Sequence, residues 1–138
     1  MRLISFISAG VLILASGFLM KKQTVPEQSL YGVKWSLKKI HTEAGVEDVN
    51  NRAFIKFDEV KQSAGGNGSC NSFGSTATVD DDQVIFSHIL STKMYCDGVQ
   101  KTEDDFFKQL EKVNRFEIKD KNLFLYHDNS ILLDFVSE

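Results

Sequence analysis

The spacing of apolar residues changes along this chain, and that change limits the folds open to it. In residues 33–37 and 53–58 apolar side chains alternate with polar ones, which is the pattern of half-buried β-strands. From residue 99 to residue 113, side chains at spacings of four, three, four and three share one stripe of a helix. They are Val99, Glu103, Phe106, Leu110 and Val113. Strand patterns follow at 115–119, 123–127 and 131–136, with turn residues between them, which predicts three closing strands joined by tight turns.

Many short strands with one helix indicate an α+β domain. We expect a curved antiparallel β-sheet or partial barrel with one main α-helix. The polar stretches 41–52 and 61–68 are expected to be loops, and Gly74 is expected to mark a bulge in the strand that follows. Asp97 is expected to cap the helix, with Gln100 as its partner in a capping box.

The N-terminal segment has the composition of an export signal. Between Arg2 and Lys21 the chain carries no charge, and one basic residue before an apolar run is typical of a signal peptide. The small residues at 15–17 would allow cleavage after Gly17. The run is also about as long as a membrane span, so residues 1–22 are either a signal peptide or a membrane anchor.

A polar stretch at 23–30 is expected to link this segment to one domain at 31–138, which is too short to be divided in two. The formal net charge is −3, and lysines and glutamates are spread along the chain. This distribution does not favour nucleic acid as a partner. If the first segment is not cleaved, the membrane itself is an expected partner.

Cys70 and Cys96 are the only two cysteines. In an oxidising compartment two cysteines of a small domain are expected to form one disulfide, whereas in a reducing one they would be buried thiols or metal ligands. Because the N-terminal segment predicts export, the disulfide is the expected state. A pair of buried free thiols is the alternative, since the sequence does not reveal the distance between them.

Other candidate sites in the sequence lack the residues that their chemistry needs. His41, His88 and His127 share no close spacing with each other or with the cysteines, as zinc sites require. The glycine-rich stretch at 65–68 has no lysine and hydroxyl pair of a phosphate-binding loop, and the aspartates at 80–82 lack the glycine and glutamate of a calcium loop. We therefore expect no catalytic, cofactor-binding or metal-binding residues, and no enzyme activity.

Glu103 is the one charged residue on the apolar helical stripe. A carboxylate in such a place could have a raised pKa and act as an acid or base. Alternatively it could accept hydrogen bonds from backbone N–H groups of an adjacent loop, such as residues 91–96, and so anchor that loop. The structural role is the expected one.

Two blocks around the cysteines, together with the helix glutamate, resemble the META domain of HslJ-like bacterial envelope proteins. The blocks read GSCNSFG at 68–74 and STKMYC at 91–96, and the resemblance extends from Tyr31 to the C-terminus. Ser69 and Asp97 depart from the family pattern without breaking a predicted element. Besides the cysteines, the resemblance gives structural importance to a set of motif residues. These are Asn71, Gly74, Ser91, Thr92, Lys93, Met94 and Glu103.

The resemblance implies a non-enzymatic protein exported to the bacterial cell envelope, periplasmic or membrane-anchored, that contributes to stress tolerance by binding an envelope protein. The alternative is a carrier or sensor of a small apolar ligand held in the open end of the curved sheet. Such a pocket would be lined by phenylalanines among Phe54, Phe57, Phe86 and Phe106.

Overall fold

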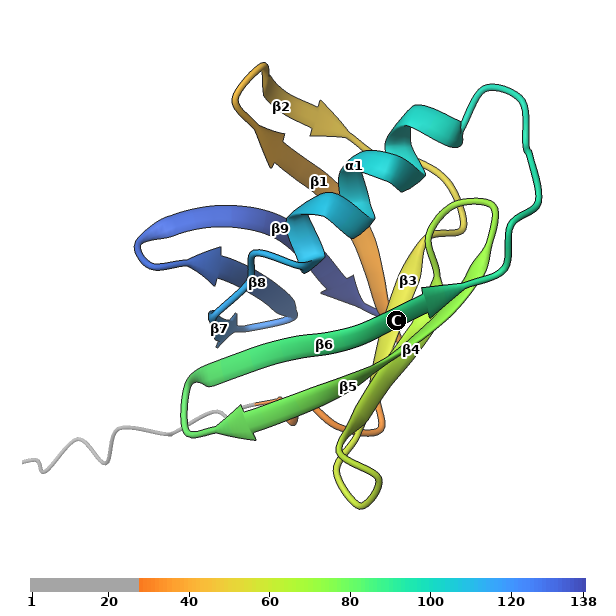
Figure 1. The fold of residues 1–138 in the computed structure, drawn as a ribbon. Coiled ribbons are helices and arrows are strands. Elements are labelled where there is room, and N and C mark those ends of the chain that lie inside the picture. The colour runs from red at the N-terminus through yellow and green to blue at the C-terminus, as the bar shows by residue number, and fades with distance from the viewer. Residues whose placement is uncertain (1–27) are drawn as a thin grey trace, which may run out of the picture.

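A computed structural model describes residues 28–138 (Figure 1). The expectations for residues 1–27 concern the signal or anchor and most of the linker, and they lie outside the described residues. The described chain contains nine β-strands and one α-helix. They are β1 (Trp35–Thr42), β2 (Gly45–Asp48), β3 (Phe54–Asp58), β4 (Ser63–Asn67), β5 (Ser72–Asp80), β6 (Gln83–Ser91), α1 (Gln100–Leu110), β7 (Arg115–Lys119), β8 (Asn122–His127) and β9 (Ser130–Ser137).

The strands form one antiparallel sheet that curls into a ring. Its order is β2-β1-β3-β4-β5-β6-β7-β8-β9, and an additional pairing of β1 with β9 brings the two ends together. Between β6 and β7 only Gln83 and Arg115 pair, so the ring is nearly open there. The connection across this gap contains α1 (Figure 1). The predicted α+β class, with a curved antiparallel sheet or partial barrel and one helix, is confirmed.

The inside of the ring is filled by large side chains. Trp35 from β1, Phe135 from β9 and Phe106 from α1 are fully buried. The Phe106 ring packs edge-on against Phe73 and Phe135, with ring centroids 5.5 and 6.2 Å apart, so the helix contacts both sides of the ring. The predicted stripe of the helix is confirmed, because Glu103, Phe106 and Leu110 are buried, together with Gln109.

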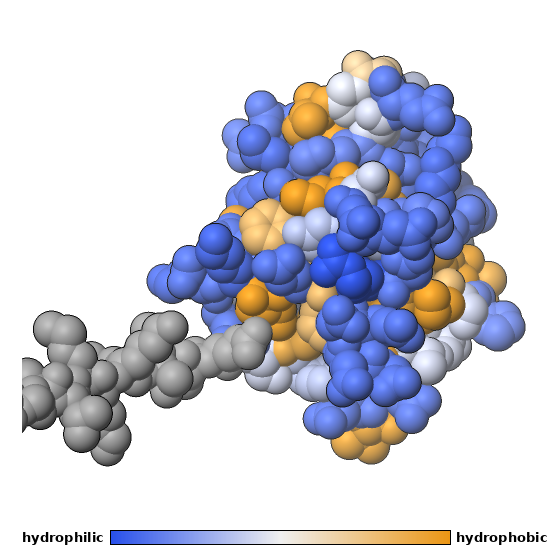
Figure 2. Space-filling view, turned by 90° about the vertical axis from the view of Figure 1, so that its left-hand side faces the viewer, coloured by the Kyte–Doolittle hydropathy of each residue, from blue (hydrophilic) through white to orange (hydrophobic). Residues whose placement is uncertain are grey.

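Most apolar side chains lie in this core rather than on the surface. In the view turned by 90° the surface is mostly hydrophilic, and hydrophobic residues form several small, separate patches (Figure 2). Leu30 belongs to the core as well, and its carbonyl accepts a 3.0 Å hydrogen bond from the Trp35 indole. Ordered packing therefore begins before residue 31. No helix of residues 28–138 is long and apolar enough to cross a membrane.

Two stretches expected to be loops contain strands. β1 continues to Thr42 and forms a hairpin with β2, and β4 occupies residues 63–67. The prediction failed for β2 because its four residues are mostly exposed and so carry no apolar alternation. It failed for β4 because Gly65 and Gly66 lie within the strand, where glycine is normally unfavourable. In β4 glycine is required because the backbone of β3 lies close to it. A Cβ on Gly66 would lie 2.1 Å from the Phe54 carbonyl oxygen.

The predicted start of the helix is wrong. The helix begins at Gln100 with Val99 as N-cap, and no side chain caps it. Asp97 and Gln100 therefore do not form a capping box. Gly98, at φ +79°, turns the chain between Cys96 and the helix, which delays the first helical residue. The bulge at Gly74 is confirmed, because the register between β5 and β6 shifts between Gly74 and Thr76.

The glycines of β4 and β5 allow a matched test of this packing. We expect Gly66→Ala to lower the free energy of unfolding by about 1 to 3 kcal/mol or more, because the new methyl group overlaps backbone rather than a flexible side chain. A Cβ on Gly74 meets nothing within 4 Å, so Gly74→Ala should be neutral or stabilising by up to about 1 kcal/mol. Urea denaturation of both variants measures the difference. Equal stability of the two would contradict the close approach of β3 and β4.

Candidate functional site

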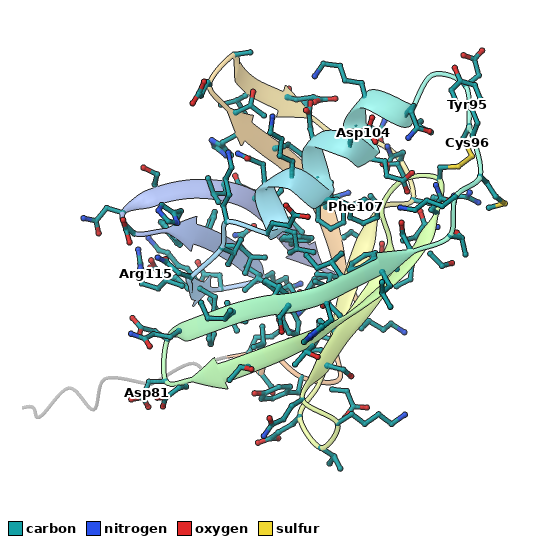
Figure 3. The ribbon with its side chains drawn as sticks, viewed as in Figure 1. Asp81, Tyr95, Cys96, Asp104, Phe107 and Arg115 are labelled. Carbon is teal, nitrogen blue, oxygen red and sulfur yellow. A yellow bond between two sulfur atoms is a disulfide. The ribbon has the colours of Figure 1, made fainter. Side chains whose placement is uncertain are left out.

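The loop between β6 and α1 is tied covalently to the turn between β4 and β5. Cys70 and Cys96 form a disulfide with their Cα atoms 5.7 Å apart, as predicted. Cys70 is buried in the turn, and Cys96 lies on the loop that bows out beyond the end of β6 (Figure 3). The bond joins residues that are 26 positions apart, so it holds the block at 68–74 against the block at 91–96.

Asn71 holds the same loop through its side-chain amide. Its Oδ1 accepts hydrogen bonds from the Thr92 hydroxyl at 2.8 Å and the Met94 N–H at 2.7 Å. Its Nδ2 donates to the Met94 carbonyl at 3.0 Å and to Glu103 Oε2 at 2.7 Å. These four bonds use the full capacity of a primary amide. Asn71 is itself buried, so the loop is fixed from inside the protein.

Glu103 lies beneath this arrangement and is 1% exposed. Its Oε1 accepts the backbone N–H of Asn71 at 2.6 Å and that of Cys70 at 3.4 Å. The expected anchoring role is correct, but the expected donors are not. The N–H groups come from the turn before β5, and Glu103 reaches loop 91–96 only through the Asn71 side chain. Its place in the first turn of α1 also suits a negative charge.

Gly68 is needed for this contact. A Cβ there would lie 2.6 Å from the Phe107 ring and 2.8 Å from Glu103 Oε1. The missing side chain lets the turn approach the helix closely enough for the carboxylate to reach the backbone N–H groups. Gly68 of the first motif therefore leaves the space that the Glu103 side chain occupies.

The remaining motif residues have simpler roles. Lys93 is exposed, and its ammonium donates to the Ser91 hydroxyl at 3.2 Å. The side chain of Met94 is 58% exposed although its backbone is held by Asn71. Gly74 is exposed on β5 and pairs with Leu90 of β6, so it contributes no side chain to the disulfide-linked loop. The structure thus brings together Asn71, Thr92, Met94 and Glu103 but not Gly74.

Arg52 is one contributor that the sequence did not indicate. Its guanidinium donates to the carbonyls of Ser69 and Cys70, at 3.2 and 3.1 Å, just before β3. Asn67 Nδ2 also donates to the Cys70 carbonyl, at 3.3 Å. Arg52 lies in a polar stretch without periodicity and is 18 residues from Cys70, so no local pattern marks it.

His41, His127 and the two cysteines, which the sequence analysis weighed as metal ligands, each have a bonded partner. Residues 28–138 contain no group of three or more His, Cys, Asp or Glu side chains that could hold a metal ion. His41 is bonded to Asp134 at 3.2 Å, and His127 is bonded to the Lys112 carbonyl at 2.7 Å. The sulfur atoms are joined in the disulfide, so neither is a thiol nucleophile.

A shallow cavity of about 320 Å³ lies between the disulfide-linked loop and α1. Its walls include Tyr95 from the loop and Asp104 and Phe107 from the helix, all three labelled in Figure 3. Tyr95 is 76% exposed, whereas Phe107 packs on Phe73 at 5.3 Å between ring centroids. This mixed lining is suited to surface contact rather than to enclosing an apolar molecule.

The phenylalanines that would line a pocket in the carrier alternative mostly form the core. Phe57, Phe86 and Phe106 are buried, and the first two pack on each other at 5.8 Å between ring centroids. Phe54 is half-buried on β3, where the Lys34 ammonium lies 5.0 Å from its ring centre. The three buried rings fill space inside the ring of strands.

The order of the strands and the helix agrees with one family, and so do the disulfide and hydrogen bonds that join the two motif blocks. The META domain model matches residues 28–138. The chain belongs to the META domain family. No curated protein matches the chain.

Solved structures share the fold at low sequence identity. A protein from Burkholderia xenovorans, known from an NMR structure, superposes with a TM-score of 0.66 at 16% identity, covering 98% of this chain and 99% of that one. A second NMR structure has a TM-score of 0.56 at 16% identity and covers 75% of this chain and 88% of its own. At this identity the likeness concerns the fold alone.

The role of the buried Glu103 carboxylate in this META domain can be tested against a control substitution on the same helix. We expect Glu103→Gln to lower the free energy of unfolding by about 1 to 3 kcal/mol, because the variant loses charge and turns an NH₂ group toward donors. Asp104→Asn, on the exposed neighbour, should change it by no more than about 0.5 kcal/mol. Urea denaturation of both proteins measures the difference. An unchanged Glu103→Gln protein would refute the anchoring role.

The disulfide is tested by alkylation of the unfolded protein without reductant. We expect no labelled thiol before reduction and two afterwards. The double variant Cys70→Ser with Cys96→Ser should lose roughly 3.5 kcal/mol of stability, because a closed loop of this length restricts the unfolded chain. Two labelled thiols in the unreduced protein would show that the bond does not form.

Proposed function

We propose that this META-domain protein is exported to the bacterial cell envelope and acts there by binding, contributing to stress tolerance without catalysing a reaction. The observation that carries the proposal is the disulfide between the two motif blocks. Structural disulfides persist in oxidising compartments and are rare in the cytosol. The uncharged stretch from Leu3 to Met20 supports the same destination from the sequence.

A binding role is supported by the way the site uses its polar groups. The Glu103 oxygens and the Asn71 amide are occupied by hydrogen bonds within the protein, so they hold a surface loop in place. Leu90, Met94 and Tyr95 are large side chains of this region that remain exposed, at 74%, 58% and 76%. A rigid loop with exposed apolar side chains favours a protein partner, because little conformational entropy is lost when it binds.

The second candidate, a carrier of a small apolar ligand, would need a dry cavity at the open end of the curved sheet. Trp35, Phe106 and Phe135 are fully buried inside the ring, which leaves less room for such a cavity. A thermal-shift screen of lipids and apolar small molecules tests it directly, since a ligand that binds only the folded state raises the melting temperature. A saturable shift at micromolar concentration would favour the carrier over the protein-binding role.

Export is tested by expressing the full chain in a bacterial host and separating the envelope from the cytosol. We expect the chain in the envelope fraction with its disulfide formed. A control that lacks residues 2–22 should stay in the cytosol with two thiols that react with an alkylating reagent. Full-length protein in the cytosol with both thiols labelled would defeat the proposal. N-terminal sequencing then separates a cleaved signal, which gives Phe18 as the first residue, from an anchor.

A further inference from the structure

The strand β6 has a free edge within residues 28–138. On one side β6 pairs with β5, but on the other side it pairs with β7 only between Gln83 and Arg115. The Val84 N–H donates to the Asn114 carbonyl, and beyond that point no strand of the described chain lies against this edge. A free strand edge presents unpaired N–H and C=O groups, to which another extended chain can bind.

The end of this edge opens onto a cavity beside α1. The helix runs back along β6 in the opposite direction (Figure 1). Residue 114, which follows the helix, bonds to the start of β6, and the first half of the helix faces its end. There Ser91, Asp104 and Phe107 line the cavity of about 320 Å³ described above. Because this space separates Ser91 from the helix, an added chain can reach the strand.

Two residues at the end of β6 direct their backbone groups toward this space. The Thr92 N–H donates to the Ser72 carbonyl at 3.1 Å, so Thr92 faces β5. Backbone groups alternate between the two sides of a strand, so those of Ser91 and Ile89 face away from β5. Earlier in β6 the register with β5 shifts, and His88 adopts φ +54°. A bulge of this kind interrupts regular pairing, so the usable edge is residues 89–91.

The side chains at this edge differ between the two faces of the sheet. Leu90 is 74% exposed and pairs with Gly74, which has no side chain to cover it. Ser91 pairs with the buried Phe73 and lies on the inner face, where it lines the cavity. A strand added to residues 89–91 would therefore place one side chain beside Leu90 and the next one in the cavity.

Carboxylates outnumber ammonium groups in the cavity. Glu103 and Asp104 line it, and Lys93 is the one lysine among its described lining residues. Asp104 accepts a hydrogen bond from the neutral Gln100 amide at 3.1 Å, and within residues 28–138 it forms no ion pair. A basic side chain in the cavity would pair with Asp104 and lay its aliphatic stem on the Phe107 ring.

We propose that residues 89–91 and the adjoining cavity bind a short extended segment of a partner protein, which adds an antiparallel strand to β6. Antiparallel pairing is expected because it is slightly more stable per residue than parallel pairing. The partner residue opposite Ser91 is basic, since its side chain enters the cavity beside Asp104. The residue opposite Leu90 is apolar, since the two side chains are neighbours. This inference rests on the proposed binding role and deepens it by naming the partner's chemistry.

The test is an NMR titration of the full ¹⁵N-labelled chain, purified with its disulfide formed, with the acetylated peptide amide Thr-Arg-Val-Thr-Thr. In the antiparallel register its arginine lies opposite Ser91 and its valine opposite Leu90. We expect saturable shifts of the amide signals of residues 86–92 and of Asp104. The amides of Ile89 and Ser91 should also exchange more slowly with solvent. The absence of a saturable shift, or shifts confined to other residues, would overturn the proposal.

N-methylation of the peptide separates strand addition from non-specific attraction. Methyl groups on the second and fourth nitrogens remove the donors that face β6, so affinity should fall about tenfold with the loss of two hydrogen bonds. Methyl groups on the third and fifth nitrogens point away from the edge and should change affinity by no more than about twofold. An equal loss for both peptides would show that no strand is added.

The basic position is tested on both molecules. Glutamate in place of the peptide's arginine should weaken binding, and Asp104→Asn should weaken binding of the arginine peptide by about twofold to fivefold. The control Asp120→Asn removes an equal charge from the exposed turn between β7 and β8 and should leave the affinity unchanged. Equal binding of the arginine and glutamate peptides would overturn the assignment of a basic partner.

Failure of this proposal is distinguishable from failure of the proposed function. A chain that is exported with its disulfide formed but binds no peptide would retain export and lose the strand-addition site. Full-length protein in the cytosol would defeat export without changing the peptide titration.

Discussion

The buried carboxylate of Glu103 is the contact on which the arrangement of the two motifs depends. It is desolvated, and it is stabilised by backbone N–H groups of the turn before β5 and by the Asn71 amide. A buried charge is tolerated only when such donors surround it. The contact joins three segments that are far apart in sequence, namely the turn at 68–71, the loop at 91–96 and α1. The ring pairs β6 with β7 at only one position, and the Glu103 and Asn71 contacts tie the segment that follows β6 to the helix that precedes β7.

This arrangement uses polar groups for structure rather than leaving them to react. The Asn71 amide makes four hydrogen bonds, and the cysteines are joined to each other. The disulfide and the hydrogen bonds are complementary, because one restricts the unfolded chain while the others fix the folded geometry. The large apolar side chains that remain exposed on the held loop are Met94 and Tyr95. This exposed and fixed loop is the reason that binding is the function we propose.

Secondary structure was predicted best from the sequence where one face of a strand or helix is buried and the other is exposed. The runs at 53–58, 115–119 and 131–136 are strands, and the helix buries the predicted stripe, because periodic apolar residues directly record which face is buried. The prediction failed for β2, whose side chains are mostly exposed, and for β4, whose glycines are selected by close backbone packing. It also failed for the start of the helix, where Gly98 redirects the chain.

For the site, the sequence by itself determined which residue types were present: two cysteines, an asparagine beside one of them, and a single glutamate on an apolar stripe. These indicated a disulfide and a structural carboxylate. Only the tertiary structure decided that Asn71 connects them, that Arg52 supports the turn, and that β6 pairs with β7 at one position and leaves the rest of that edge free. The physical reason is that hydrogen bonds and free strand edges depend on positions in space, and strand pairing brings together residues that no local spacing relates.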